Sequence, residues 1–280
     1  MANKYEKAPT DQGPTRQFSG IQSKDPIKDP PSTSTHGREG SNKIQGEKSR
    51  RKRRTRRARS CPYLFRDKEH CFKVLEGQVG KRLLNSSKDF LLQGLCFYDA
   101  GSRSFYTTKA GVNSPEDLEG LKIRVMNHQM SVEMVNAMGG SATPMAYGEL
   151  YTALQQGVVD GAENNPPSFV SSNHYEVAKF YTLDEHTAIP DVLVIGTKYW
   201  DKLSEQEKGW ITDAATRSVA TQKQYWKDSV DECMKTIEAA GVQVIRPDKT
   251  LFSEKTQSIL TDFANDPQMK ALVDAIKSEL

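Results

Sequence analysis

The pattern of hydrophobic and polar positions divides the chain at about residue 61. Residues 1–60 offer few apolar anchors, such as Ile21 and Phe18, among many Pro, Ser, Thr, Gly, Gln and Lys residues. A segment of this composition cannot bury enough apolar surface to offset the entropy cost of ordering it. We therefore predict that residues 1–60 form a disordered tail and that residues 61–280 form the folded part.

From Phe65 onward, apolar residues recur with the spacing of helices and strands. The apolar stripe from Phe72 to Leu84 predicts a helix, or a broken pair of helices, over residues 67–88. Further helices are expected at 129–138 and 147–156, and Ser114-Pro115 marks a helix start. The expected strands lie at 94–98, 104–107, 121–125, 142–144, 158–163, 192–195 and 242–245. Strands that alternate with helices in this way indicate an α/β fold with a largely parallel sheet.

The C-terminal part of the pattern contains one unusually long helix. Ser204 and Glu207 form a capping box that begins it, and Gly241 ends it. A helix of this length is expected to run across two packed lobes. The continuous apolar run 192–195 before it predicts a buried strand, and two helices are expected after the strand at 242–245.

Charge separates the same two parts of the chain. Residues 1–60 carry 16 Lys and Arg but 6 Asp and Glu, which leaves 23 basic and 30 acidic residues in the rest. The basic run 48–59 is compatible with binding to nucleic acid or anionic lipid, with a targeting signal, or with a solvated charge block. We favour a fourth interpretation, that residues 1–60 are not native to the remainder, because nothing in the tail leads into the folded part.

Sequence motifs give little support to catalysis. The histidines show no paired metal-ligand spacing, the four cysteines no CxxC motif, and the glycines no phosphate-binding motif. We therefore predict no enzyme activity, no catalytic residue, no metal and no cofactor. No stretch approaches the roughly 20 apolar residues of a membrane span, and Met1 is followed by polar residues rather than by the apolar region of a signal peptide.

Candidate binding residues lie where two expected strands end. Arg124 lies on the polar face of the strand at 121–125, and its planar guanidinium suits a carboxylate bidentately. Asn164 follows the strand at 158–163 and offers amide donors and an acceptor. Glu163 contradicts an anion site unless it pairs with an arginine and fixes its geometry. A structurally paired or exposed Arg124 is the competing interpretation.

Four segments then appear in a recognisable order, at residues 101–105, 114–125, 142–164 and 175–181. Together they resemble the DctP-type substrate-binding proteins of TRAP transporters, over about residues 62–280. The resemblance implies two α/β lobes of the type II periplasmic binding fold, joined by a hinge and a long helix. It places the ligand-binding lobe at about 97–195 and the remainder, including the long helix and C-terminal helices, at 61–96 and 196–280.

The resemblance also implies a function and a set of site residues. Arg124 is expected to bind the ligand carboxylate, with contributions from the side chains of Arg103, Asn164, Tyr147, Asn127 and Glu163. Family members are periplasmic and deliver an organic acid to a permease built from membrane subunits. The segment Tyr98-Asp-Ala-Gly-Ser-Arg-Ser-Phe-Tyr106 is most similar to members that bind sugar acids such as uronates. A C4-dicarboxylate stays open as the ligand.

The tail departs from the family pattern, in which an export signal and an α/β stretch build most of the first lobe. Without that stretch, apolar surface on the long helix and near residues 242–245 should stay exposed. We therefore predict that this chain alone is poorly stable and binds ligand weakly or not at all. The alternative function is a nucleic-acid or anionic-surface binding protein that acts through the run 48–59, although nucleic acid is not the favoured partner.

Overall fold

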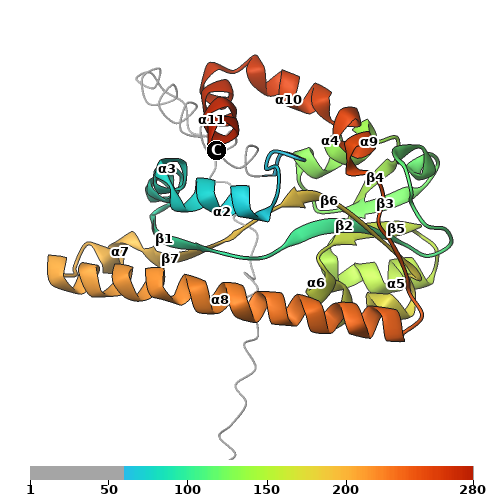
Figure 1. Ribbon diagram of the computed structural model, residues 1–280, viewed down its shortest axis with the longest axis horizontal. Coiled ribbons are helices and arrows are strands. Elements are labelled where there is room, and N and C mark those ends of the chain that lie inside the picture. The colour runs from blue at the N-terminus through green and yellow to red at the C-terminus, as the bar shows by residue number, and fades with distance from the viewer. Residues whose placement is uncertain (1–59, 280) are drawn as a thin grey trace, which may run out of the picture. The chain divides into compact units, whose positions relative to one another are not determined.

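The computed structural model describes residues 60–279, which contain alternating helices and strands (Figure 1). The predicted disordered tail and the basic run at 48–59 therefore lie outside the described residues. None of the helices within residues 60–279 is both long and apolar enough to cross a membrane.

A six-stranded sheet has the strand order β4-β3-β5-β2-β6-β8. Its strands are β2 (Ser102–Thr107), β3 (Lys122–Val125), β4 (Ser141–Pro144), β5 (Gly161–Asn164), β6 (Phe180–Ala188) and β8 (Gln243–Ile245). Strand β3 is parallel to β4 and β5, and β6 is parallel to β8, whereas β2 is antiparallel to β5 and β6. The sheet is thus mixed rather than largely parallel, because β2 lies antiparallel to both of its neighbours.

A separate two-stranded sheet contains β1 (Leu92–Tyr98) and β7 (Asp191–Gly196) in antiparallel pairing. The strands expected at 94–98 and 104–107 therefore belong to different sheets. The buried strand predicted at 192–195 forms, but the exposed fraction of Val194 is 39%. This part of the prediction was wrong, because within residues 60–279 β7 has a neighbour on one side only.

Within residues 60–279, four short 3₁₀ helices, labelled η1 to η4, lie among the α-helices. In chain order, the helices are α2 (Lys68–Glu76), α3 (Gln78–Ser86), η1 (Ser87–Phe90), η2 (Pro115–Leu118), α4 (Gln129–Ala137), η3 (Tyr147–Glu149), α5 (Leu150–Gln155), α6 (Pro166–Ser171), η4 (His174–Glu176), α7 (Thr197–Trp200), α8 (Glu205–Ala239), α9 (Lys249–Lys255), α10 (Gln257–Ala264) and α11 (Pro267–Ser278). Three helices follow β8 instead of the predicted two. Figure 1 shows α2 and α3 on one side of the two-stranded sheet and α8 on the other.

Two apolar clusters cover the two faces of the six-stranded sheet. Phe105 and Ile123 face a cluster that includes Met134 of α4, whereas Tyr106 and Tyr181 face a cluster that includes Phe169 of α6. This alternation follows from the two-residue period of a strand. Because Phe105 and Tyr106 are neighbours in β2, one strand anchors both clusters.

Helix α8 begins as predicted, with the Glu207 backbone N–H donating to the Ser204 hydroxyl at 3.3 Å. It packs on β1 through Ala215 and Val219, and its C-terminal end reaches the second cluster through Ile237. Its Trp210 and Tyr225 are exposed at 63% and 72%, as expected for this helix.

The expected exposure near residues 242–245 was wrong. Val242 and Ile245 are buried, with exposed fractions of 5% and 8%. The reason is that β8 pairs with β6 and so joins the six-stranded sheet. The division of residues 61–280 into a lobe at about 97–195 and a remainder stays a prediction.

Candidate ligand site at the ends of β3 and β5

Arg124 lies in β3, between the parallel strands β4 and β5, and only 3% of it is exposed. Its Nε and Nη2 atoms both donate to the carbonyl oxygen of Met145, at 3.0 and 2.7 Å. Within residues 60–279 no carboxylate forms an ion pair with this guanidinium. The Met145 carbonyl orients the side chain, but it does not neutralise the charge.

Tyr147, in η3 just after β4, covers Arg124. The centre of its ring lies 5.4 Å from the guanidinium carbon of Arg124, a distance at which the ring face attracts a cation. The Tyr147 hydroxyl lies 2.7 Å from the hydroxyl of Ser172 and donates to the Ser168 carbonyl oxygen at 3.3 Å. Since 42% of Tyr147 is exposed, its ring is available to a ligand beside Arg124.

His174 packs against the ring of Tyr147. Its ring centre lies 5.6 Å from that of Tyr147 in an edge-to-face arrangement, and its Nδ1 atom lies 2.8 Å from the hydroxyl of Tyr106. Burial, and then the charge of Arg124, lower the pKa of His174 to about 4. His174 is therefore neutral at pH 7 and adds no charge next to Arg124.

Arg103 of β2 holds the end of β5. Its Nε atom forms an ion pair with a Glu163 carboxylate oxygen, Nη1 donates to Asn164 Oδ1 at 2.8 Å, and Nη2 donates to the Glu163 carbonyl oxygen at 2.7 Å. Antiparallel pairing of Ser104 with Asn164 brings these residues together. Glu163 therefore pairs with an arginine, as the sequence argument required. Its negative charge is neutralised, so an anion can bind nearby.

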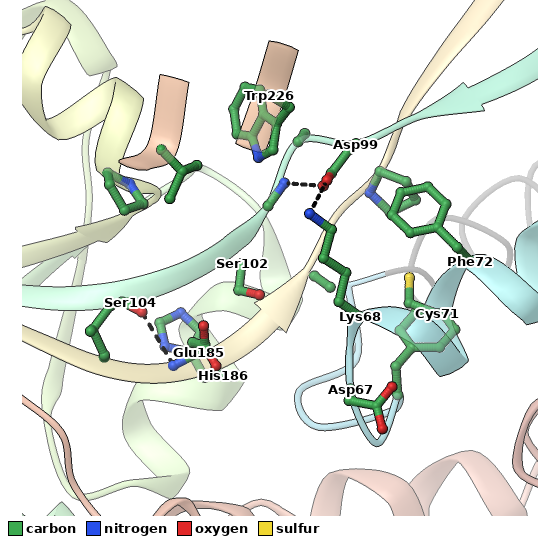
Figure 2. A pocket seen from close by; sticks show the side chains of 18 of the residues that line it. Asp67, Lys68, Cys71, Phe72, Asp99, Ser102, Ser104, Glu185, His186 and Trp226 are labelled. Carbon is green, nitrogen blue, oxygen red and sulfur yellow. Dashed lines mark hydrogen bonds and ion pairs between the residues drawn. The ribbon is translucent and has the colours of Figure 1, made fainter. Parts of the chain in front are cut away.

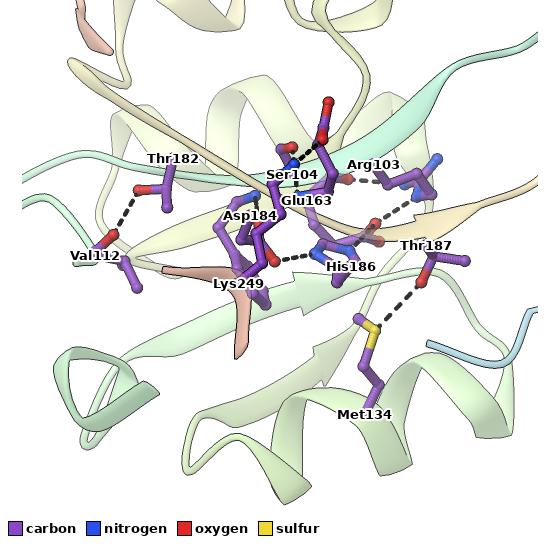
Figure 3. Close-up of polar contacts among 12 residues, drawn as sticks. Arg103, Ser104, Val112, Met134, Glu163, Thr182, Asp184, His186, Thr187 and Lys249 are labelled. Atoms are coloured by element: carbon purple, nitrogen blue, oxygen red, sulfur yellow. Dashed lines mark hydrogen bonds and ion pairs between the residues drawn. The ribbon is translucent and has the colours of Figure 1, made fainter. Parts of the chain in front are cut away.

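His186 of β6 continues this row of contacts (Figure 3). Its Nδ1 atom lies 2.7 Å from Asp184 Oδ2, and its Nε2 atom lies 3.4 Å from Glu163 Oε2. Burial alone would lower the pKa of His186, but Asp184 and then Glu163 outweigh burial and raise it to about 9. Burial alone would raise the pKa of Glu163, but Arg103 and His186 hold it below its ordinary value.

The six residues expected from the sequence are thus arranged in two contacting sets and one outlier. Arg124 contacts Tyr147, and Arg103 contacts both Glu163 and Asn164. The two sets are neighbours in the sheet, because Arg124 pairs with Ala162, the residue before Glu163. Asn127 is exposed beyond the end of β3, and its role stays a prediction.

The sequence did not identify Tyr106 or His174 as part of this site. Tyr106 lies in an expected strand, so it was interpreted as an ordinary strand residue. His174 lies in η4, a single turn whose local sequence carries no periodic signal. For both residues, the only sign of a functional role in the sequence was a polar side chain among apolar neighbours.

A cavity without any of these residues lies elsewhere, where β1 leads into β2 beside α2 and α8 (Figure 2). Its volume is about 570 Å³, and it is lined by Phe72 of α2, Trp226 of α8 and residues 99–102 among others. Lys68 Nζ lies 2.5 Å from a carboxylate oxygen of Asp99 there. None of the six expected site residues lines this cavity, so buried charge rather than cavity size marks the candidate site.

Metal-binding groups give no competing site. Within residues 60–279, no three His, Cys, Asp or Glu side chains are grouped so that they could hold a metal ion. The four cysteines are free thiols, and the thiols of Cys71 and Cys96 have raised pKa values because of burial.

The family model for bacterial extracellular solute-binding protein, family 7, named DctP, matches residues 45–266. The chain belongs to this family. The resemblance and the α/β fold with a long helix predicted from the sequence are thereby confirmed. Members of the family and its solved neighbours are transport solute-binding proteins rather than enzymes.

Curated family-7 relatives match this chain over most of its described length. A solute-binding protein of Chromohalobacter salexigens is 40% identical over 220 residues, which cover 78% of this chain and 66% of the relative. The 2,3-diketo-L-gulonate-binding periplasmic protein of Escherichia coli is 31% identical over 218 residues, which cover 77% of this chain and 66% of that relative. This chain therefore spans about two thirds of the length of these relatives.

Solved family-7 structures share the fold. The TRAP periplasmic solute-binding protein of Chromohalobacter salexigens with bound D-glucuronate has a TM-score of 0.78 and 38% identity, covering 81% of this chain and 76% of that one. The corresponding protein of Xanthobacter autotrophicus, with bound β-D-galacturonate, has a TM-score of 0.75 and 40% identity. The match covers 80% of this chain and 75% of that one.

Proposed function

We propose that this chain is the solute-binding component of a TRAP transporter, which captures a sugar acid such as a uronate in the periplasm and delivers it to a membrane permease. Family membership supports the transport role. Bound glucuronate and galacturonate in solved neighbours support the sugar-acid class. The proposed role is binding without chemical change of the ligand.

The buried guanidinium of Arg124 carries this proposal. A charge that is 97% removed from solvent, and that has no ion-pair partner within residues 60–279, is costly unless a ligand neutralises it. Within residues 60–279, Nη1 of Arg124 makes no hydrogen bond, whereas Nε and Nη2 donate to the Met145 carbonyl oxygen. A ligand carboxylate would receive charge-assisted hydrogen bonds there.

The charge count of the site favours a ligand with one carboxylate. Arg103 and His186 are balanced by Glu163 and Asp184, and the lowered pKa of His174 keeps that side chain neutral. One positive charge, on Arg124, is left over. A C4-dicarboxylate would bring a second negative charge close to Glu163, so we favour a sugar monoacid.

The remaining polar groups suit the hydroxyls of a sugar. Asn164 Oδ1 accepts from Arg103 and from the Asn165 backbone N–H, which leaves its amide group to donate to a ligand. Glu163 Oε1 is buried without a hydrogen-bond partner within the described residues, and it is an acceptor for a hydroxyl or a water. The exposed ring of Tyr147 would lie against the apolar face of the sugar.

Saturation-transfer NMR on the full chain with D-glucuronate tests this proposal, because the method detects weak binding. We expect a signal for D-glucuronate or D-galacturonate and a weaker one for succinate. Arg124→Ala should abolish the signal, whereas Arg217→Ala, on the exposed side of α8, should leave it unchanged. Arg217 is a matched control because its side chain is 75% exposed and paired with Asp213 one turn away.

The same substitution in the Chromohalobacter relative keeps the test decisive if the chain alone binds too weakly. Replacing the arginine of that protein that aligns with Arg124 should lower its affinity for a uronate by about a hundredfold or more, as expected for a lost charge-assisted pair. Unchanged affinity in calorimetry would show that Arg124 does not mark the carboxylate site.

A further inference from the structure

Residues 99–101 connect β1 of the two-stranded sheet with β2 of the six-stranded sheet. Their backbone is held by a side chain of α8. Gln222 accepts from the Asp99 N–H through Oε1 and donates to the Asp99 carbonyl oxygen through Nε2, both at 2.8 Å. The Gly101 N–H donates to Asp99 Oδ1 at 2.9 Å. A side-chain amide that both donates to and accepts from the backbone of one residue fixes the position and the direction of that backbone.

One face of α8, which runs past both sheets (Figure 1), follows this connection. Ser218, Gln222 and Trp226 lie four residues apart on the helix, and residues with this spacing share a face. The Ser218 hydroxyl lies 2.8 Å from that of Tyr98, the last residue of β1. The indole of Trp226 lies against Gly101, where an added Cβ atom would be only 3.0 Å from Nε1. Gly101 therefore has no room for a side chain against α8.

Asn165 holds the same connection from the candidate ligand site. This buried residue follows Asn164, and its Nδ2 atom donates to the Ala100 carbonyl oxygen at 3.0 Å. Its backbone N–H donates to Asn164 Oδ1 at 2.9 Å, the same oxygen that accepts from Arg103 at 2.8 Å. Two donors thus fix the amide plane of Asn164. One of them belongs to the residue that binds the connection between the sheets.

The side-chain oxygen of Asn165 reaches the residues that hold Tyr147. Its Oδ1 atom accepts from the Ser168 N–H at 2.9 Å and so caps the first turn of α6. The Ser168 carbonyl oxygen in turn accepts from the Tyr147 hydroxyl at 3.3 Å. Asn165 therefore fixes the turn that binds Tyr147 with one end of its amide and the connection between the sheets with the other.

We propose that Asn165 and Gln222 are positioning residues of the ligand site, which hold residues 99–101 between α8 and the turn after β5. This inference rests on the function proposed above. The oxygen and the nitrogen of both side-chain amides have protein partners, so these amides orient their neighbours rather than bind the ligand. Without either contact, the turn that carries Asn164 is no longer fixed relative to α8. Ordering the site then costs binding free energy.

NMR titration of the full chain with D-glucuronate tests this inference. Asn165→Ser keeps a hydroxyl that caps α6 but removes the donor to Ala100, and it should weaken binding about tenfold. Gln222→Met should weaken binding about threefold, because Gln222 acts on the site only through the connection. Gln224→Met is the matched control and should bind as the wild type does. Gln224 is exposed on the same helix and donates to Asp228 one turn away.

A second set of variants separates positioning from stability. Val219→Ala removes an apolar contact between α8 and β1, so it should lower the urea midpoint and leave affinity unchanged. The double variant Asn165→Ser/Gln222→Met should weaken binding less than the product of the two single effects, because both act on one connection.

Three results would overturn the inference alone: wild-type affinity in both single variants, a multiplicative double variant, or an equally large loss in Val219→Ala. A wild-type chain that does not bind D-glucuronate would overturn the proposed function as well.

Discussion

The imidazole Nδ1 atom of His186 lies 2.7 Å from a carboxylate oxygen of Asp184, and neither side chain reaches solvent. On its other side, His186 faces Glu163, which in turn pairs with Arg103. Two positive and two negative side chains thus alternate along one buried row. This arrangement ties the stability of the fold to the protonation of a single histidine.

We expect stability to fall as pH rises above neutral. The folded pKa of His186 is raised from 6.5 to about 9, so its contribution is complete below pH 6.5 and is lost as pH rises through 9. Urea unfolding at pH 6.5 to 8.5 should show a decrease on the order of 2 kcal/mol. His186→Gln should be less stable at pH 6.5 and show a flatter profile. A wild-type profile as flat as that of the variant would contradict a charged His186.

The strands and helices were largely predictable where the apolar pattern is strong. The capping box at Ser204 and the stripe from Phe72 to Leu84 define α8, α2 and α3 because local chemistry fixes them. Strand β6 was not predicted, since Asp184, Glu185 and His186 interrupt its apolar alternation. Asp184 and His186 are nevertheless buried, because the Phe105 N–H of β2 donates to Asp184 and Glu163 of β5 faces His186. Such long-range pairing has no local signal.

The candidate site was predictable in its residues but not in its arrangement. Arg124 and the pair Glu163-Asn164 could be found at strand ends, and the resemblance added Arg103 and Tyr147. The sequence could not show that Arg103 is neutralised by Glu163, whereas Arg124 has no ion-pair partner among residues 60–279. That difference depends on strand register, which brings residues 60 positions apart into contact.

Removing the charge of Glu163 should destabilise the fold strongly. Glu163→Gln leaves Arg103 and His186 without their shared anion in a buried setting, and loss of one partner of a buried pair typically costs about 3 kcal/mol or more. Combining Glu163→Gln with Arg103→Met should recover part of the loss, because the unpaired charge disappears. Unfolding free energies of the two single variants and the double variant form the cycle. Additive losses would show that Arg103 and Glu163 are not energetically coupled.

The pKa of His174 should report on Arg124. Burial and the positive charge of Arg124 lower this pKa to about 4, so NMR titration of the ring protons should give a value well below 6.5. Arg124→Ala removes the second cause and should raise the pKa of His174, whereas Arg217→Ala should leave it unchanged. Because the folded pKa is lowered, the contribution of His174 to stability is present above pH 6.5 and is lost as pH falls through 4. A pKa of His174 that does not respond to Arg124→Ala would separate the two residues electrostatically.

Tyr147 should contribute to binding through its ring more than through its hydroxyl. Tyr147→Phe keeps the ring over Arg124 and loses only the contacts to Ser168 and Ser172, so affinity for D-glucuronate should fall less than about fivefold. Tyr147→Ala removes the surface against the sugar and the cation–π contact, and affinity should fall about tenfold or more. NMR titrations of both variants, or calorimetry on the matching variants of the Chromohalobacter relative, measure the difference. An equal loss for both variants would assign the role of Tyr147 to its hydroxyl, and no loss for either would place the ligand away from this ring.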